Sequence, residues 1–103
     1  MNNNHSDWIL QPQEQDGSYF FSGHFYVTKG IEALLSYDEI FELYRRIKQL
    51  VLEKNGLDYL QVFKHKNSEQ QLFFIDQLSK EMIRSGNFKP TDNHCTLLLA
   101  EEY

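Results

Sequence analysis

The sequence predicts an α+β fold: one domain in which a small sheet of three to five strands packs against one long amphipathic helix, beside a second helix. Apolar residues make up 41% and aromatic residues 15% of the 103 positions, enough to bury a modest core without a metal or disulfides. Short aromatic and β-branched runs bounded by turn residues also alternate with one long stretch of helical apolar spacing. We expect residues 1–103 to form a single domain, with residues 1–5 disordered.

Composition and charge narrow the class of protein. The single cysteine, Cys95, excludes an internal disulfide and with it a disulfide-stabilised secreted framework. The first residues lack the basic start and apolar run of a signal peptide, and no stretch approaches the roughly 18 apolar residues of a membrane span. We therefore expect a cytoplasmic protein without a membrane partner. The net charge of −5 argues against direct binding of nucleic acid, because the densest basic group, Lys64-His65-Lys66, is too small to form a groove for phosphates.

Two strand-forming runs are predicted before residue 30. Trp8-Ile9-Leu10 and Tyr19-Phe20-Phe21 flank Asp16-Gly17, a dipeptide suited to the positive φ angles of a tight turn, so we predict a β-hairpin here. Residues 24–28 are aromatic and β-branched and lie between Ser22-Gly23 and Gly30, which predicts a strand.

A long helix is predicted over residues 37–54. Ser36 and Glu39 form a capping box, in which each side chain accepts a hydrogen bond from the other residue's backbone amide. Asn55-Gly56 supplies a left-handed stop. The apolar residues recur at three- and four-residue steps, which places them on one face of the helix: Ile40, Leu43, Tyr44, Ile47, Leu50 and Val51.

Two later runs predict strands. Residues 57–63 carry apolar side chains on both alternating faces, which is typical of a strand near the centre of a sheet. Residues 96–100 form an apolar run that suits a buried terminal strand.

The stretch between these runs is predicted as a second helix. Ser68 and Gln71 match another capping box, and Gly86 ends a pattern of apolar residues at four-residue steps. The alternative is a strand at residues 72–75, because a short apolar run does not distinguish helix from strand by periodicity alone. The residues that favour the helix are Phe74, Leu78 and Met82.

Cys95 is the candidate nucleophile, since a histidine that took its proton would give the reactive thiolate. The histidines available for this role are His24, His65 and His94. The sequence contains no recognisable motif for an oxyanion hole or for a third residue that would orient the histidine. Free cysteine is also among the most buried residue types. We therefore interpret Cys95 as a buried structural thiol and assign no catalytic residue.

The same region offers atoms that ligate metals. Asp92, His94 and Cys95 lie close together in sequence, with His65 or His24 as a distant fourth ligand. No paired motif brings two ligands onto one element, and His94 and Cys95 would face opposite ways in a strand. We predict no metal site and no cofactor.

Charged and glycine-bearing segments give three weaker candidates. Thr28-Lys29-Gly30 separates a strand from a helical stretch, where backbone amides bind anions, but it lacks the glycine spacing of a phosphate loop, so we assign Gly30 to the turn. Glu101 and Glu102 are interpreted as solubilising charge at a strand end rather than as catalytic carboxylates.

The basic helix segment Arg45, Arg46 and Lys48 is the third of these candidates, as a site for an acidic partner. Because Glu42 lies four residues before Arg46 and can pair with it, we favour a solvated helix face.

Three runs of the sequence resemble a known family. They are Val27-Thr28-Lys29-Gly30-Ile31, residues 57–63, and the closing Leu-Leu-Ala-Glu-Glu-Tyr within residues 96–103. In this order they are similar to the domain of unknown function family nine-sixty, small uncharacterised proteins of Gram-positive bacteria and their mobile elements. The resemblance covers residues 25–103, departs from the family pattern at residues 64–93, and implies an intracellular bacterial protein. The family is more strand-like in that stretch, which weakens the prediction of a second helix, and it transfers no catalytic residue.

Our leading hypothesis is a non-enzymatic interaction or regulatory module, based on abundant aromatics, a high density of Tyr and Phe before Gly30, and no reactive constellation. We expect a protein partner, with a homodimer as one form. One alternative is an acidic inhibitor that occupies a nucleic-acid-binding surface, although fifteen acids are interleaved with ten bases. A second alternative is a small enzyme that uses Cys95 and a histidine.

Overall fold

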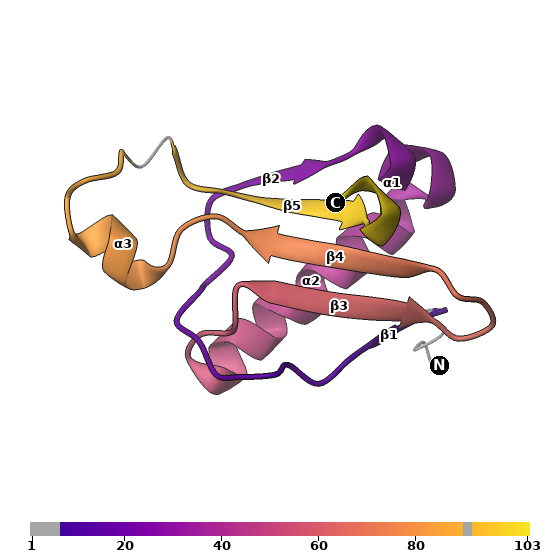
Figure 1. The fold of residues 1–103 in the computed structure, drawn as a ribbon, viewed down its shortest axis with the longest axis horizontal. Helices are drawn as coiled ribbons and strands as arrows, with labels where there is room; N and C mark the ends of the chain where they lie inside the picture. The colour runs from indigo at the N-terminus through magenta and orange to yellow at the C-terminus, as the bar shows by residue number, and fades with distance from the viewer. Residues whose placement is uncertain (1–6, 90–91) are drawn as a thin grey trace.

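The computed structural model describes residues 7–89 and 92–103. It is an α+β fold with a five-stranded mixed sheet and three α-helices, one of them long (Figure 1). The prediction of disorder at residues 1–5 lies outside the described residues. In chain order the elements are β1 (Trp8–Leu10), β2 (His24–Val27), α1 (Lys29–Leu34), α2 (Tyr37–Lys54), β3 (Leu60–His65), β4 (Gln71–Asp76), α3 (Lys80–Arg84), β5 (His94–Leu99) and the 3-10 helix η2 (Ala100–Glu102).

The strands of the sheet are ordered β1-β3-β4-β5-β2. The three pairs β1·β3, β3·β4 and β4·β5 are antiparallel, whereas the edge strand β2 runs parallel to β5. Because β2 and β5 come from opposite ends of the chain, their pairing joins the N-terminal and C-terminal parts into one sheet. The central strand, β4, has hydrogen-bonded neighbours on both sides.

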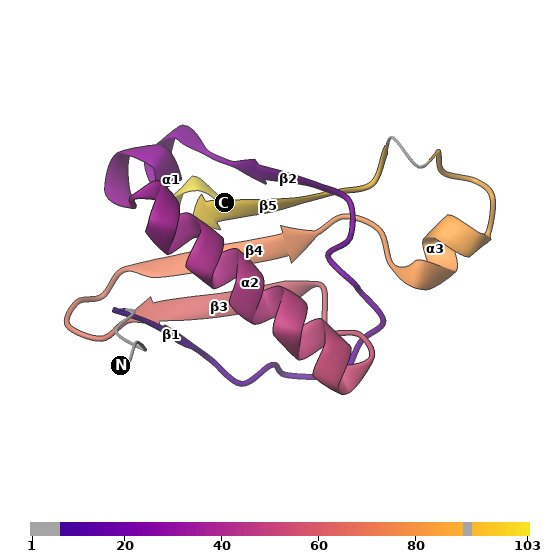
Figure 2. The ribbon, with the colours of Figure 1, turned by 180° about the vertical axis from the view of Figure 1, so that it is seen from behind.

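Helix α2 lies across one face of this sheet (Figure 2). Both halves of the predicted capping box form, since Ser36 Oγ accepts from the Glu39 amide at 3.2 Å and Glu39 Oε1 accepts from the Ser36 amide at 2.9 Å. The helix ends where Asn55 and Gly56 adopt φ angles of 57° and 119°, as the predicted left-handed stop requires. Its buried residues are Ile40, Leu43, Ile47 and Val51.

The outward side of α2 is not purely polar. Tyr37, Phe41 and Leu52 are exposed on it. The core lies between α2 and the facing side of the sheet, where the largest fully buried side chains are Phe21, Phe63, Phe74, Ile31, Leu43, Ile47, Leu57, Leu72 and Leu97.

The predicted strands at residues 24–28, 57–63 and 96–100 are present with shifted bounds. The middle one begins at Leu60 because Leu57 forms an isolated antiparallel bridge with Tyr19, with both backbone hydrogen bonds at 2.9 Å. The last one begins at His94, and Ala100 belongs to η2.

The predicted N-terminal hairpin is wrong. Trp8–Leu10 does form a strand, but β1 pairs with β3, and Tyr19 bridges to Leu57 instead of to β1. Gly17 serves close packing: an added Cβ there would lie 2.2 Å from the Leu57 carbonyl oxygen. The glycine of Asp16-Gly17 thus permits backbone approach to the segment before β3 rather than a hairpin turn.

The predicted second helix is also wrong, and the strand alternative is confirmed. Residues Gln71–Asp76 form β4, with side chains alternating between half-buried and buried. Ser68 Oγ accepts from the Gln70 amide at 3.2 Å, in the turn between β3 and β4, so it caps no helix. Only Lys80–Arg84 is helical, and its N-cap is Ser79. The apolar residues recur at four-residue steps by coincidence, because Phe74 lies in β4 and Met82 lies in α3.

Candidate functional site

The face of the sheet opposite α2 is the first candidate site, and we call it the open face. No helix among the described elements covers it, as the view from that side shows (Figure 1). Successive side chains of a strand point to opposite faces, so the strand residues that do not face α2 lie here. Five apolar ones are half-buried and adjacent in register: Leu60, Val62, Phe73, Ile75 and Leu98.

Cross-strand pairing makes the open face continuous. Val62 lies opposite Phe73, which lies opposite Leu98, and Leu60 lies opposite Ile75 in the next row. Tyr103 extends the surface, since its ring meets the Phe73 ring edge-on with centroids 5.6 Å apart. The result is an apolar strip across β3, β4 and β5.

Two hollows border this strip, and both carry acidic side chains. One lies along β3 and is lined by Leu60 and Val62 together with Glu14 of the segment between β1 and β2. The other is lined by Phe73, Glu69 and Glu101, among others. The open face is therefore apolar at its centre and largely acidic at these two margins; Lys64 is a basic residue in the first hollow.

Cys95 lies on the opposite, buried face. Its side chain has no exposed surface, and its Sγ lies 4.0 Å from the Phe21 carbonyl oxygen. Burial, followed by the nearby Asp76 carboxylate, raises the pKa of the thiol to about 12, so it stays protonated at neutral pH. This agrees with the interpretation of Cys95 as a buried structural thiol.

The structure does not bring the candidate histidines together with Cys95. His24 and His94 are paired on neighbouring strands and project from the open face, while Cys95 projects toward α2. His65 packs edge-on against Trp8, with ring centroids 4.8 Å apart, at the other end of the sheet order. Within the described part of the chain, no group of three or more His, Cys, Asp or Glu is placed to hold a metal ion.

A buried carboxylate anchors the segment next to Cys95. Asp76 Oδ2 accepts from the Phe21 amide at 2.8 Å, and Phe21 has a positive φ of 50°. Lys48 Nζ donates to the Phe21 carbonyl at 2.9 Å and to the Phe20 carbonyl at 3.3 Å. Burial raises the pKa of the Asp76 carboxyl, and backbone amides together with Lys48 oppose this rise. We infer that these hydrogen bonds hold the strained backbone of Phe21 in place, with its side chain in the core.

At Thr28-Lys29-Gly30, the candidate anion position that we set aside, the chain itself supplies a carboxylate, and Gly30 lies in the first turn of α1 rather than in a turn before it. Glu102 Oε1 accepts from Thr28 Oγ1 at 2.6 Å and from the Leu99 amide at 2.8 Å. A Cβ on Gly30 would lie 2.7 Å from Glu102 Oε2, so glycine makes room for this carboxylate. The hydrogen bond from Thr28 lowers the pKa of Glu102. Glu102 thus fastens the C-terminus to the start of α1, a role beyond the predicted solubilising one.

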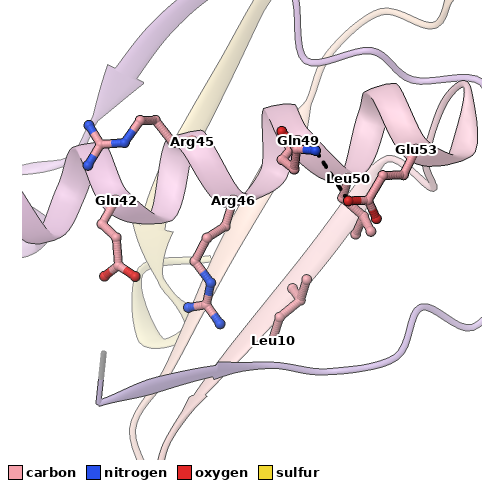
Figure 3. Close-up of a pocket in the computed structure, with 7 residues that line it drawn as sticks. All are labelled: Leu10, Glu42, Arg45, Arg46, Gln49, Leu50 and Glu53. Atoms are coloured by element: carbon pink, nitrogen blue, oxygen red, sulfur yellow. Dashed lines mark hydrogen bonds between the residues drawn. The ribbon is translucent and has the colours of Figure 1, made fainter. Parts of the chain in front are cut away.

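A groove between α2 and β1 contains most of the predicted basic segment (Figure 3). Arg46 Nη1 donates to the Trp8 carbonyl at 3.0 Å, and its guanidinium lies 5.7 Å from the centre of the Phe63 ring. Lys48 donates to the Phe20 and Phe21 carbonyls. Arg45 is therefore the outward-pointing cation of the three. The segment holds β1 and residues 20–21 in place. The groove is lined by Leu10, Glu42, Arg45, Arg46, Gln49, Leu50 and Glu53.

Comparisons with models of protein families, with curated proteins and with solved structures find no match. The resemblance to the domain of unknown function family nine-sixty therefore stays a prediction. Of the helices that the structure describes, none has the length and apolar character to cross a membrane.

Proposed function

We propose that the protein is a non-enzymatic interaction module that binds a partner protein on its open face. The observation that supports this most directly is the continuous apolar strip from Val62 through Phe73 to Leu98, on a sheet face that the described helices leave uncovered. Contiguous apolar surface rimmed by polar residues marks interaction sites in soluble proteins. The open face is apolar along the strip and polar at its margins, and its strip residues keep part of their surface accessible.

The partner we propose is a protein whose own apolar patch is bordered by basic residues. The chain carries a net charge of −5, and Glu14, Glu69 and Glu101 line the hollows beside the strip. Complementary charge at the rim accelerates encounter and selects partners, while the apolar centre supplies affinity. A second copy of the same acidic rim is a poorer fit to this face.

We assign this binding a regulatory role: the candidate nucleophile Cys95 faces the core, away from His24 and His94 on the open face, and the described residues assemble no metal cluster. On the resemblance described above, we place this role in the cytoplasm of a Gram-positive bacterium, in the service of the cell or of a mobile element.

Site-specific photo-crosslinking in cells tests this proposal. A photoreactive residue replaces Phe73 in one variant and Leu52, on the outward side of α2, in a matched control. We expect a defined protein to be crosslinked from position 73 and not from position 52, and we expect its contact surface to be basic around an apolar centre. Equal crosslinking from both positions, or an acidic partner surface, would contradict the proposal.

The identity of the crosslinked protein also separates the alternative. If it binds DNA or RNA and loses that ligand when this chain is added, the module is an acidic inhibitor of a nucleic-acid-binding surface. If it keeps its ligand or has none, that alternative is excluded.

A further inference from the structure

Among the described strands, none pairs with the outer edge of β2, on the side away from β5. His24 and Thr28 direct their backbone amides toward β5, donating to the Asn93 and Leu97 carbonyls at 3.1 and 3.2 Å. In a parallel pair the alternate residues point the other way, so the amides and carbonyls of Phe25 and Val27 face outward. No described strand or helix runs alongside this edge in either view; α1 follows at the C-terminal end of β2 (Figures 1 and 2).

Exposed aromatic side chains border this edge on the helix side. Phe25 stacks on Tyr44 of α2, with ring centroids 4.4 Å apart, which shows that the Tyr44 side of the helix faces β2. Phe41 and Tyr37 precede Tyr44 by three and seven residues, so they lie on the same side of α2. Phe41 is 49% and Tyr37 70% exposed. On the open-face side, Tyr26 is 53% exposed.

We propose that this edge is a homodimer interface, in which β2 of a second copy pairs antiparallel with β2. With Phe25 of each copy opposite Val27 of the other, all four outward groups of each strand are hydrogen-bonded. The two-fold axis then stands perpendicular to the sheet at Tyr26, and the two sheets become one of ten strands. The exposed aromatic residues of the two α2 helices approach each other on the far side.

A second copy fits this edge better than an unrelated strand for two reasons. Identical antiparallel edges are self-complementary around a two-fold axis, so one set of residues completes both halves. The edge strand itself also carries no formal charge, since β2 is His24-Phe25-Tyr26-Val27. On the helix border, exposed Asp38 and Arg45 flank Phe41 with opposite charges, so a two-fold pairing brings no excess of one sign to the contact.

The available area predicts a weak dimer. Aromatic side chains bury roughly 150–250 Å² each, so the exposed parts of Tyr26, Tyr37 and Phe41 supply on the order of 350 Å² per copy. Standard stable interfaces bury about 800 Å² per partner, and smaller ones belong to transient complexes. We expect a dissociation constant on the order of micromolar.

The dimer has one consequence that rests on the proposed function. Because the axis is perpendicular to the sheet, the open faces of both copies lie on the same side and form one continuous surface. A partner with two docking sites would then gain affinity by avidity.

Hydrogen exchange of the full chain, followed by NMR at low and high protein concentration, tests the dimer residue by residue. The Phe25 and Val27 amides should exchange fast in dilute solution and become protected as concentration rises. The His24 and Thr28 amides, already bonded to β5, should stay protected throughout. Unchanged fast exchange at Phe25 and Val27 at the highest concentration would overturn the proposal.

Sedimentation equilibrium of two matched variants provides the second test. Phe41→Glu places like charges at the apolar contact and should raise the dimer dissociation constant about ten-fold or more. Leu52→Glu makes the same change on the same helix at a position 79% exposed, and should leave it unchanged. Equal dimerisation of the two variants would contradict the interface. Both tests use this chain alone, so their outcome does not depend on whether the open face binds a partner.

Discussion

The two faces of the sheet contain the same residue types but differ in how deeply those residues are buried. On the face toward α2, Phe63, Leu72, Phe74 and Leu97 are almost completely buried. On the open face, Val62, Phe73, Ile75 and Leu98 occupy neighbouring positions of the same strands and are only half-buried. The first face packs against α2 to form the core, and the second is apolar without a covering helix in the described part of the chain. The proposed binding function rests on this apolar content beyond what the core requires.

The largest predicted difference between the faces lies at two adjacent phenylalanines of β4. Phe74→Ala should reduce the free energy of unfolding by roughly 3–5 kcal/mol, because it removes a buried ring and leaves a cavity. Phe73→Ala should cost about 1–2 kcal/mol, from lost cross-strand contacts. Denaturant melts measure both. Equal losses would mean that both faces belong to the core.

On the helix side of the core, Ile47→Ala should destabilise the protein by roughly 2–5 kcal/mol through lost burial and a cavity. Leu52→Ala, on the outward side of the same helix, should change the free energy of unfolding by less than about 0.5 kcal/mol. A change below about 0.5 kcal/mol for Ile47→Ala in denaturant melts would show that α2 does not pack through this side.

Replacement of the buried thiol has a smaller expected effect. Cys95→Ser should lower the free energy of unfolding by roughly 1–3 kcal/mol, since a hydroxyl without a strong partner is costly to bury. Binding at the open face should be unchanged, because Cys95 faces α2. The native thiol, whose pKa is raised to about 12, should react slowly with alkylating reagents until the protein unfolds. Rapid labelling of the folded protein would revive the catalytic alternative.

The smallest predicted effect concerns Glu102. Its pKa is lowered in the fold by the Thr28 hydrogen bond, so its stabilising contribution is present above the unfolded pKa and disappears as pH falls through the folded one. Glu102→Gln should therefore melt at a lower temperature than wild type near neutral pH, and this difference should shrink in acid. Glu101→Gln, at the exposed neighbouring position, is the control. A difference in melting temperature that is independent of pH would refute the role of the carboxylate.

Local signals explain which elements could be predicted from the sequence. Helix α2 was predictable in both bounds because Ser36, Glu39 and Asn55 define its ends through contacts within a few residues. Strand β4 was mistaken for a helix because the Ser68 and Gln71 pattern imitates a capping box, while the pairing with β3 and β5 that decides the matter is tertiary.

The candidate site was harder to predict for the same reason. The apolar residues on both faces of residues 57–63 predict a central strand, yet which face α2 covers is decided only by packing. The hydrogen bond between Thr28 and Glu102 joins residues 74 positions apart, and no local sequence pattern predicts it. Of the Tyr and Phe residues concentrated before Gly30, the structure places part in the core and part on the β2 edge.

The central claim is that the open face binds the partner while the rest of the molecule maintains the fold. Its most direct test is the affinity of the crosslinked partner for Phe73→Lys and for Leu52→Lys, measured by calorimetry together with the free energy of unfolding of each variant. We predict that Phe73→Lys weakens binding at least about ten-fold, through the lost aromatic contact and repulsion of a basic rim, while it stays folded. Leu52→Lys should bind as wild type does. Undiminished affinity of folded Phe73→Lys would contradict the account.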